Sequence, residues 1–100
     1  MSQEMAYEFE EIEIEKDNVT YVCYGVCSVE YTMKCEMHYN GQRLYFAEIL
    51  GYDNFKIRIC DVDGKDLEYL DVRHEHPIAQ RIIDKFDEDF ISELCNKDTE

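Results

Sequence analysis

A pattern with a period of two runs without interruption between residues 19 and 39. Every odd position in this stretch is uncharged, and from Ser28 onward the even positions are polar. A period of two is typical of an extended strand with one buried face. Asn40-Gly41 follows at once, and this dipeptide is the strongest short signal for a β-hairpin. The pattern therefore predicts a strand that turns back near residue 40.

This alternating stretch is much longer than an ordinary strand, which has about 5–6 residues. Gly25 is the expected bend or division point, because glycine within a strand marks a bulge or a close approach. Residues 19–26 are also apolar at even positions, so this half is expected to be covered on both faces. The same pattern places Cys23, Cys27 and Cys35 in one buried row.

A second alternating segment, residues 7–15, changes phase in its middle. Its aromatic residues occupy odd positions and its isoleucines even ones. This slip predicts a β-bulge at Glu10 or Glu11. Asp17-Asn18 is expected to form the turn that follows.

Further strands are expected after the hairpin. Residues 43–50 and 55–60 have strand patterns, and the residues between them, 51–54, are typical of a turn. Asp63-Gly64 is another tight-turn signal. The weaker pattern of residues 67–72 predicts a short strand or a loop.

The C-terminal quarter is expected to be one helix that begins at Pro77. Proline suits the first helical position, where its missing N–H costs nothing. Apolar residues then recur every four positions from Ile78 to Leu94, with Asn96 as the expected end. The sequence thus predicts one domain, residues 1–100, with residues 1–6 and 97–100 frayed. The expected fold is α+β: an antiparallel meander of five or six strands with one C-terminal helix packed on one face.

The formal net charge of −14 indicates which kind of partner the chain can bind. Such a chain is repelled by phosphate, which excludes direct binding to nucleic acid and favours a partner with a basic surface. The acidic start lacks the features of an export signal, and no apolar run is long enough to span a membrane. The five cysteines are therefore expected to be reduced thiols in a cytoplasmic protein.

Residues with reactive side chains form no catalytic pattern. His74 and His76 would point the same way in an extended segment and could share an ion, but a solvated loop is the simpler interpretation. Cys23 and Cys27 would lie about 13 Å apart in a strand, too far for one zinc ion with bonds of ~2.3 Å. Cys60 lies on the more polar face of its strand and is the candidate for an accessible thiol. No catalytic residue, metal ligand or cofactor is predicted, and a small metal- or thiol-dependent enzyme is a third alternative.

Acidic residues are concentrated at the two ends. Residues 1–18 contain seven acids and one base, and residues 84–100 contain seven acids and two bases, so these ends carry −6 and −5. Carboxylates at alternate positions of a strand share one face at a spacing of about 6.8 Å, which resembles the charge track of a nucleic-acid backbone. The residues expected to bind a partner are Glu11, Glu13, Glu15, Asp17, Asp84, Asp87, Glu88 and Asp89.

The acidic segment 8–17 and the acidic helix face 84–93 also carry a resemblance. In size, acidity and α+β pattern the chain resembles small phage-encoded host-takeover proteins, among them anti-CRISPR and anti-restriction inhibitors. The resemblance implies a non-enzymatic inhibitor that mimics nucleic acid and occupies the basic nucleic-acid-binding surface of a partner. If the chain is phage-encoded, its place of action is the host cytoplasm.

Two other functions fit the same description. One is a bacterial immunity protein that neutralises a nuclease toxin. The other is an interaction module, including a homodimer, that uses a sheet edge or exposed aromatic residues. Its candidate contacts are Tyr7, Tyr24, Tyr45 and Tyr52, because tyrosine is favoured at interfaces.

Overall fold

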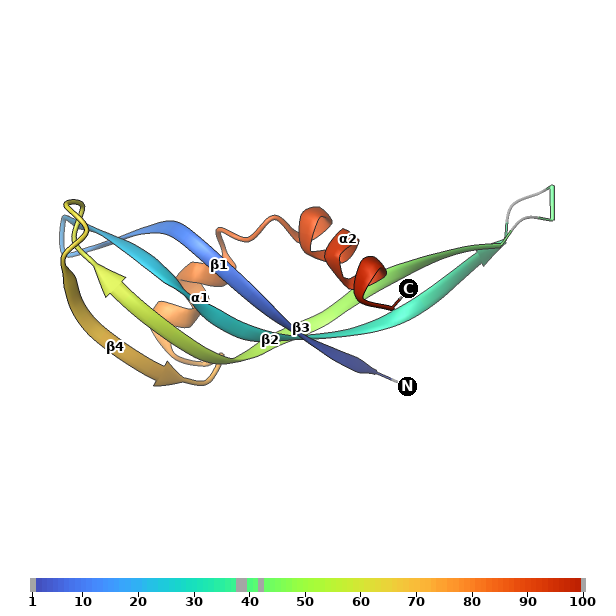
Figure 1. Cartoon of the computed structure of the whole chain (residues 1–100), viewed down its shortest axis with the longest axis horizontal. Helices are drawn as coiled ribbons and strands as arrows, with labels where there is room; N and C mark the ends of the chain where they lie inside the picture. Colours follow the sequence, from blue (N-terminus) through green and yellow to red (C-terminus); the bar gives the residue numbers. More distant parts are fainter. Residues whose placement is uncertain (1, 38–39, 42, 100) are drawn as a thin grey trace.

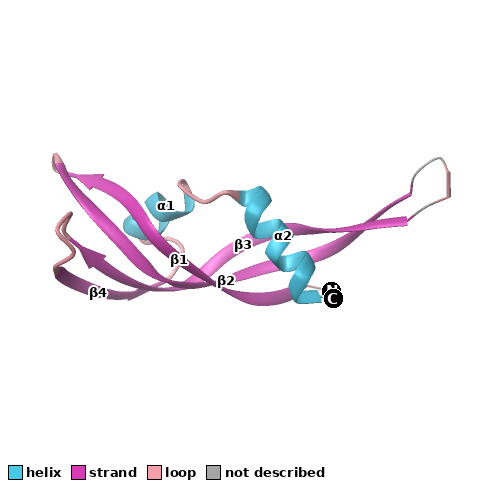
Figure 2. Cartoon of the chain, turned by 45° about the horizontal axis from the view of Figure 1, so that its top comes forward, coloured by secondary structure: helices cyan, strands magenta, loops and turns pink. Residues whose placement is uncertain are grey.

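The protein is a four-stranded antiparallel sheet with two helices on one face (Figures 1 and 2). The computed structural model describes residues 2–37, 40–41 and 43–99. The α+β meander is confirmed, but the sheet has four strands rather than five or six, and two helices replace the single one. In chain order the elements are β1 (Gln3–Lys16), β2 (Val19–Met37), β3 (Arg43–Cys60), β4 (Asp66–Val72), α1 (Pro77–Ile83) and α2 (Glu88–Thr99).

The difference in strand number arises in β3, where the turn predicted at residues 51–54 is wrong. β3 is one strand of 18 residues that pairs with β2 along most of its length. Its register against β2 shifts twice, and Asn54 has a positive φ of 53°. Because β2 offers hydrogen-bond partners throughout, the turn-forming residues are accommodated as bulges and do not reverse the chain.

β2 is a single strand of 19 residues and is not divided at Gly25. Gly25 instead marks a close approach: a Cβ built there would lie 2.1 Å from the carbonyl oxygen of Lys56 and 2.9 Å from Cζ of Phe9. The even-numbered residues of this half, such as Val22 and Val26, are half-buried. The second face of this half is thus only partly covered, because both helices pack on the other face.

The bulge and the turn predicted in the first part of the chain are confirmed. In β1 the register shifts between Phe9 and Ile12, and Glu11 has a positive φ of 51°. Asp17 and Asn18, with φ of 54° and 65°, join β1 to β2. Positive φ at both positions is the conformation of a type I′ hairpin turn.

The two remaining strand connections also use the predicted residues. Asn40-Gly41 lies between β2 and β3, and Gly41 has a φ of 82°; the neighbouring positions 38, 39 and 42 lie outside the described residues. Gly64, with a φ of 89°, occupies the turn between β3 and β4. There the Asp61 carboxylate accepts the N–H of Lys65 at 2.9 Å.

The helical segment breaks into two around Phe86, a half-buried residue that packs against the margin of the core. The expected single helix over residues 77–94 would be about 27 Å long. α1 ends at Ile83, and the Phe86 ring in the connection packs against the rings of Tyr7, Phe9 and Tyr52 at centroid distances of 5.1–5.7 Å. α2 then restarts in a new phase that leaves Phe90 exposed.

Both chain termini are held at one buried hydroxyl. Tyr31 Oη lies 3.1 Å from Gln3 Oε1 and 3.1 Å from Asp98 Oδ2. β1 accordingly begins at Gln3 and α2 continues to Thr99, where fraying was expected. Figure 1 shows the two ends of the chain close together.

The core lies between the sheet and the helices. The odd-numbered residues of β2 face the helices, as the alternation predicts, and the first helical position is Pro77. The largest fully buried side chains are Phe9, Cys23, Cys27, Val29, Tyr31, Phe55, Ile57, Cys60, Ile82, Ile91 and Cys95.

One end of the sheet continues as a two-stranded arm, and the molecule measures 53 × 21 × 21 Å (Figure 1). β1 pairs with β2 only as far as Tyr31, so residues 32–37 and 43–48 pair with each other alone; we call these residues the arm. At its base α2 covers the edge of β3, because Ala47 N–H donates to Asn96 Oδ1 at 2.7 Å and the Ala47 carbonyl accepts from Ser92 Oγ at 2.6 Å. A covered edge cannot pair with another strand.

Candidate interaction surfaces

Five glutamates of β1 lie on the face of the sheet that the helices leave uncovered. The bulge makes this possible: glutamates at even positions point outward before it, and those at odd positions do so after it. Glu8 is thus paired with Val26 and Glu13 with Val22, opposite in direction to the buried Phe9 and Ile14. We call the outward glutamates together with Glu11 at the bulge the acidic strand; all are exposed: Glu4, Glu8, Glu10, Glu11, Glu13 and Glu15.

Three of these glutamates were missed by the sequence analysis. The prediction placed the odd-numbered acids from Glu11 onward on one face. Before the bulge, however, the even-numbered residues point to that face. Applying the predicted bulge to the whole segment would have added Glu4, Glu8 and Glu10. Asp17, the last of the predicted row, lies in the turn after β1 and is exposed.

The predicted helical acids lie on the other side of the sheet. Asp84 lies beside β1, in a hollow that Arg81 and Lys85 also line, and Arg81 donates to the backbone carbonyl of Glu15 at 2.9 Å. Asp87 is the residue that caps α2, since its carboxylate accepts the N–H of Phe90 at 3.2 Å.

Asp87 and Glu88, at the start of α2, lie near tyrosines of β1 and β3. Burial, with a smaller contribution from Asp87, raises the pKa of Tyr7 on β1. Burial, with a smaller contribution from Glu88, raises the pKa of Tyr52 on β3 to about 12. Asp89, next along the helix, is exposed. The predicted acids therefore form two groups, one on each face of the sheet, and not one continuous face.

No ion pair joins either acidic group to a base within the part of the chain that the structure describes, but bases lie close to both: Lys56 and Arg58 line a hollow with Glu8 and Glu10, and Arg81 and Lys85 line one with Asp84. The ion pairs there join Lys34 to Glu48, Arg58 to Asp66, Arg73 and His74 to Asp53, and His74 to Glu75. None involves the acidic strand or the predicted acids of the helical segment. Their charge is therefore presented to the solvent, where it attracts a basic surface.

The two histidines considered for metal binding have separate structural roles. His76 Nδ1 accepts the N–H of Ile78 at 3.1 Å and caps α1. His74 Nδ1 lies 3.4 Å from the Asp53 carboxylate, which also accepts two N–H groups of Arg73. Arg73 holds the pKa of the Asp53 carboxyl well below its usual range, and the cluster ties the segment after β4 to β3. Among the described residues, no group of three or more His, Cys, Asp and Glu is arranged to hold a metal ion.

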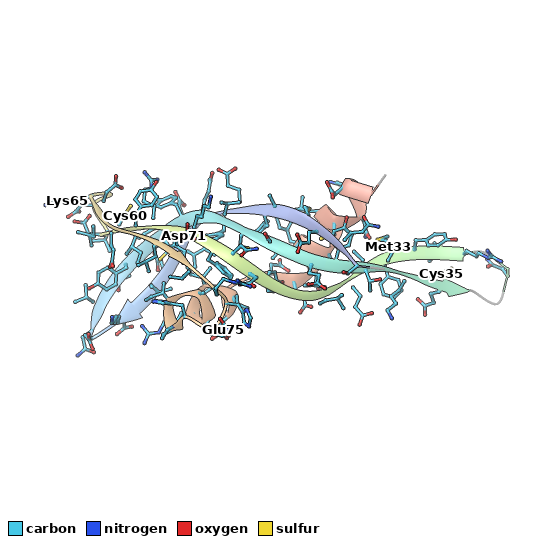
Figure 3. The ribbon with its side chains drawn as sticks, turned by 90° about the horizontal axis from the view of Figure 1, so that it is seen from below. Met33, Cys35, Cys60, Lys65, Asp71 and Glu75 are labelled. Carbon is cyan, nitrogen blue, oxygen red and sulfur yellow. The ribbon has the colours of Figure 1, made fainter. Side chains whose placement is uncertain are left out.

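Two predictions for the cysteines are wrong. Cys35 lies on the predicted face of β2 but is exposed, because it belongs to the arm and lies beyond the cover of α2. Cys60 lies on the outer face but is buried, and its Sγ is 3.2 Å from Asp66 Oδ1. Figure 3 shows these two cysteines at opposite ends of the molecule. Cys23 and Cys27 are buried as expected, and burial raises their pKa values to about 11 and about 12.

We expect one fast-reacting thiol in the folded protein. An aromatic disulfide reagent at pH 8 should modify Cys35 quickly and the other four cysteines only after unfolding, because the thiolate is the reactive form and burial suppresses it. Absorbance of the released chromophore measures both phases, and the fast phase should vanish in Cys35→Ser. A fast phase in that variant, or several fast thiols in the wild type, would contradict the structure.

The four candidate tyrosines also divide into packed and exposed side chains. Tyr7 and Tyr52 pack against Phe86 in the half-buried margin of the core. Tyr24 is half-buried beneath the Arg58 guanidinium, which lies 4.8 Å from the ring centre. Tyr45, on the arm, is 61% exposed. The sequence analysis missed its neighbours Leu44 and Phe46, which are also exposed and lie on the opposite face of the arm.

Comparisons with known proteins add nothing to this geometry. No protein-family model, curated protein or solved structure matched the chain. None of the described helices combines the length and the apolar character needed to cross a membrane.

Proposed function

We propose that this protein is a non-enzymatic inhibitor that occupies the basic nucleic-acid-binding surface of a partner protein. The observation that supports this most directly is the acidic strand, with six exposed glutamates and no ion pair to them among the described residues. The proposal places the protein in the cytoplasm and in the functional class of anti-CRISPR and anti-restriction inhibitors.

The position of β1 at the edge of the sheet suits this role. The sheet order is β1-β2-β3-β4, so β1 has a neighbour on one side only. A basic groove that received this edge would meet the acidic strand on one wall. On the other wall it would meet Asp84 and Asp87, which lie on the helical side of β1.

Many carboxylates are needed because each one contributes little. An exposed ion pair is worth about 0–1 kcal/mol, and charges further apart than a Debye length of about 8 Å are largely screened at physiological salt. Regular spacing along a rigid strand lets several weak contacts form together without further ordering of the backbone. Complementary potential also speeds encounter with a basic partner and repels acidic ones.

The test begins with a partner captured from the source cell and ends with competition. Extract freed of nucleic acid is passed over the immobilised protein, and the captured protein is purified. A fluorescent oligonucleotide bound to that partner should be displaced by the wild-type protein, and displacement should weaken as salt rises. Fluorescence anisotropy gives the inhibition constant.

Two variants of equal net charge distinguish the contribution of the acidic strand to inhibition from that of the net charge. Replacing Glu8, Glu10, Glu13 and Glu15 by glutamine should weaken inhibition at least tenfold. Replacing four other exposed glutamates by glutamine should change it by less than about twofold, since the same net charge is removed elsewhere. Equal effects of both variants, or none from the first, would refute the proposal. The control residues are Glu36, Glu48, Glu68 and Glu75.

A further inference from the structure

β4 is the outermost strand of the sheet on the side away from β1 (Figures 1 and 2). Helix residues form hydrogen bonds with the backbone of β1 and of the arm: Arg81 with Glu15, and Ser92 and Asn96 with Ala47. Among the described residues, no turn, loop or helix forms a backbone hydrogen bond with β4. An edge strand of this kind presents a row of N–H and C=O groups with which a further extended segment can pair.

The side chains of β4 differ between the two faces of the sheet. Leu70 pairs with the buried Ile57 and therefore points to the side of the helices. Its neighbours Tyr69 and Asp71 point to the outer face, and both are exposed. A strand added beside β4 would continue both faces, because the side chains of directly paired residues lie on the same side of a sheet.

An apolar hollow lies beside β4 on the side of the helices. Its volume is about 360 Å³, and apolar side chains form most of its lining, among them Leu67, Leu70, Ile59 and Ile78; Lys16 also lines it. Leu67 is 48% exposed at this place. Alternate side chains of an added strand would reach the hollow, and such pockets give strand addition its specificity. An apolar side chain suits it, because an unpaired charge is costly to bury.

Charge indicates which strand fits the outer face. β4 contains three acids, Asp66, Glu68 and Asp71, and no base. Asp66 is paired with Arg58, whereas Asp71 has no ion pair in the part of the chain that is described. Tyr69 adds an exposed aromatic ring, which attracts a cation. A second copy of β4 would place acids against acids, which destabilises paired strands, whereas lysine or arginine opposite these residues stabilises them.

We propose that β4 binds an extended segment of a partner protein as a further strand of the sheet. The segment carries apolar residues on the side of the hollow and lysine or arginine at the alternate positions, opposite Tyr69 and Asp71. Its main chain supplies affinity, and its alternate side chains supply specificity. This site lies at the opposite edge of the sheet from the acidic strand, so the inference goes beyond the proposed inhibition.

Fluorescence anisotropy of a labelled peptide tests the inference. The probe has four Val-Lys repeats, and it should bind the protein with a dissociation constant between about 1 μM and 1 mM. A peptide of the same composition with all lysines first has no alternating faces and should bind about tenfold more weakly or worse. Absence of binding by the alternating peptide, or equal binding of the two peptides, would overturn the inference.

Backbone methylation distinguishes strand addition from general attraction of a basic peptide. Alternate N–H groups of a strand point to the same edge, so methylating the N–H of every valine, or of every lysine, blocks one edge of the peptide only. One of these two peptides should therefore lose binding, while the other stays within about threefold of the unmodified probe. Equal affinities of the two methylated peptides would contradict pairing with β4.

Two protein variants of equal net charge test whether the peptide binds at β4. Tyr69→Ser combined with Asp71→Asn should weaken peptide binding about tenfold or more. Tyr45→Ser combined with Glu36→Gln removes an exposed tyrosine and an acid from the arm, and should change binding by less than about twofold. All four side chains are exposed, and circular dichroism verifies that both variants fold. Equal losses in the two variants would place the peptide elsewhere and overturn the inference.

The glutamine variant of Glu8, Glu10, Glu13 and Glu15 separates this site from the proposed inhibition. An added strand would lie four strand spacings, about 19 Å, from β1, which exceeds the Debye length of about 8 Å at physiological salt. The variant should therefore bind the peptide within about threefold of the wild type, and a tenfold loss would contradict a separate site at β4. Inhibition is measured by displacement of the oligonucleotide, so either proposal can fail while the other stands.

Discussion

Gly25→Ala is expected to lower the free energy of unfolding by about 3 kcal/mol or more, the upper end of overpacking effects. The added Cβ would lie 2.1 Å from the carbonyl oxygen of Lys56 in β3 and 2.9 Å from the buried Phe9 ring in β1. Backbone oxygen cannot rotate away as a side chain can, so strand β2 must move from β3. Urea unfolding followed by circular dichroism measures the change.

Gly51→Ala is the matched control for this substitution. Gly51 also lies in a long strand, but a Cβ there would meet no atom within 4 Å and its φ is not positive. Alanine at such a position reduces the freedom of the unfolded chain and is expected to stabilise by about 0.4–1 kcal/mol. If both substitutions lowered the free energy of unfolding by similar amounts, the close approach of β3 and Phe9 would not be the reason that position 25 requires glycine.

Phe86→Ala is expected to lower the free energy of unfolding by about 3 kcal/mol, the lower end of the range for buried phenylalanine, because the ring is half-buried. The Phe86 ring contacts the rings of Tyr7, Phe9 and Tyr52, and so joins β1 to β3 beneath the helical connection. Aromatic pairs add about 0.5–1.5 kcal/mol beyond the area they bury. The midpoint of thermal unfolding, with urea unfolding for the free energy, measures the loss.

Phe90→Ala provides the comparison within the same segment. Phe90 is 50% exposed, although the four-residue spacing gives it the same apparent status as Phe86. Its truncation is expected to cost less than about 1 kcal/mol, since surface substitutions usually have small effects. If Phe90→Ala were as damaging as Phe86→Ala, the helical segment would be continuous and the break between α1 and α2 would be wrong.

The break between α1 and α2 also affects where the acids of this segment lie in the candidate interaction surface. Asp84 and Asp87 lie near Phe86 in the connection, so the packing of this half-buried ring helps to determine where these carboxylates emerge beside β1. A Phe86→Ala protein that remained folded should therefore inhibit less well than the wild type, because only the β1 glutamates would keep their positions.

Local signals were sufficient where the structure depends on neighbouring residues. The hairpin turns at Asp17-Asn18 and Gly41 follow from residues that tolerate positive φ. The bulge predicted at Glu10 or Glu11 follows from the phase slip in the alternation of β1. The side of β2 that faces the helices follows from its period of two, since a one-residue slip would bury its polar residues. These features could be predicted because their energetic causes lie within a few positions of one another.

Local signals failed where distant segments compete. The turn signal at residues 51–54 is overridden because β2 is long enough to pair with β3 on both sides of it. The exposure of Cys35 and the burial of Cys60 depend on where α2 and Asp66 lie, and the residue pattern of neither strand contains that information.

The sequence by itself determined the antiparallel meander, its tight turns, the apolar face of β2 and the concentration of negative charge at the two ends. Periodicity and backbone preference act over a few residues, and charge can be counted. Only the tertiary structure decided that the acids flank one edge strand on two sides, that the helical segment breaks around Phe86, and that the apolar face of the arm is left uncovered. Those outcomes depend on which segments meet, and packing between residues far apart in the chain chooses among the arrangements that the local pattern allows.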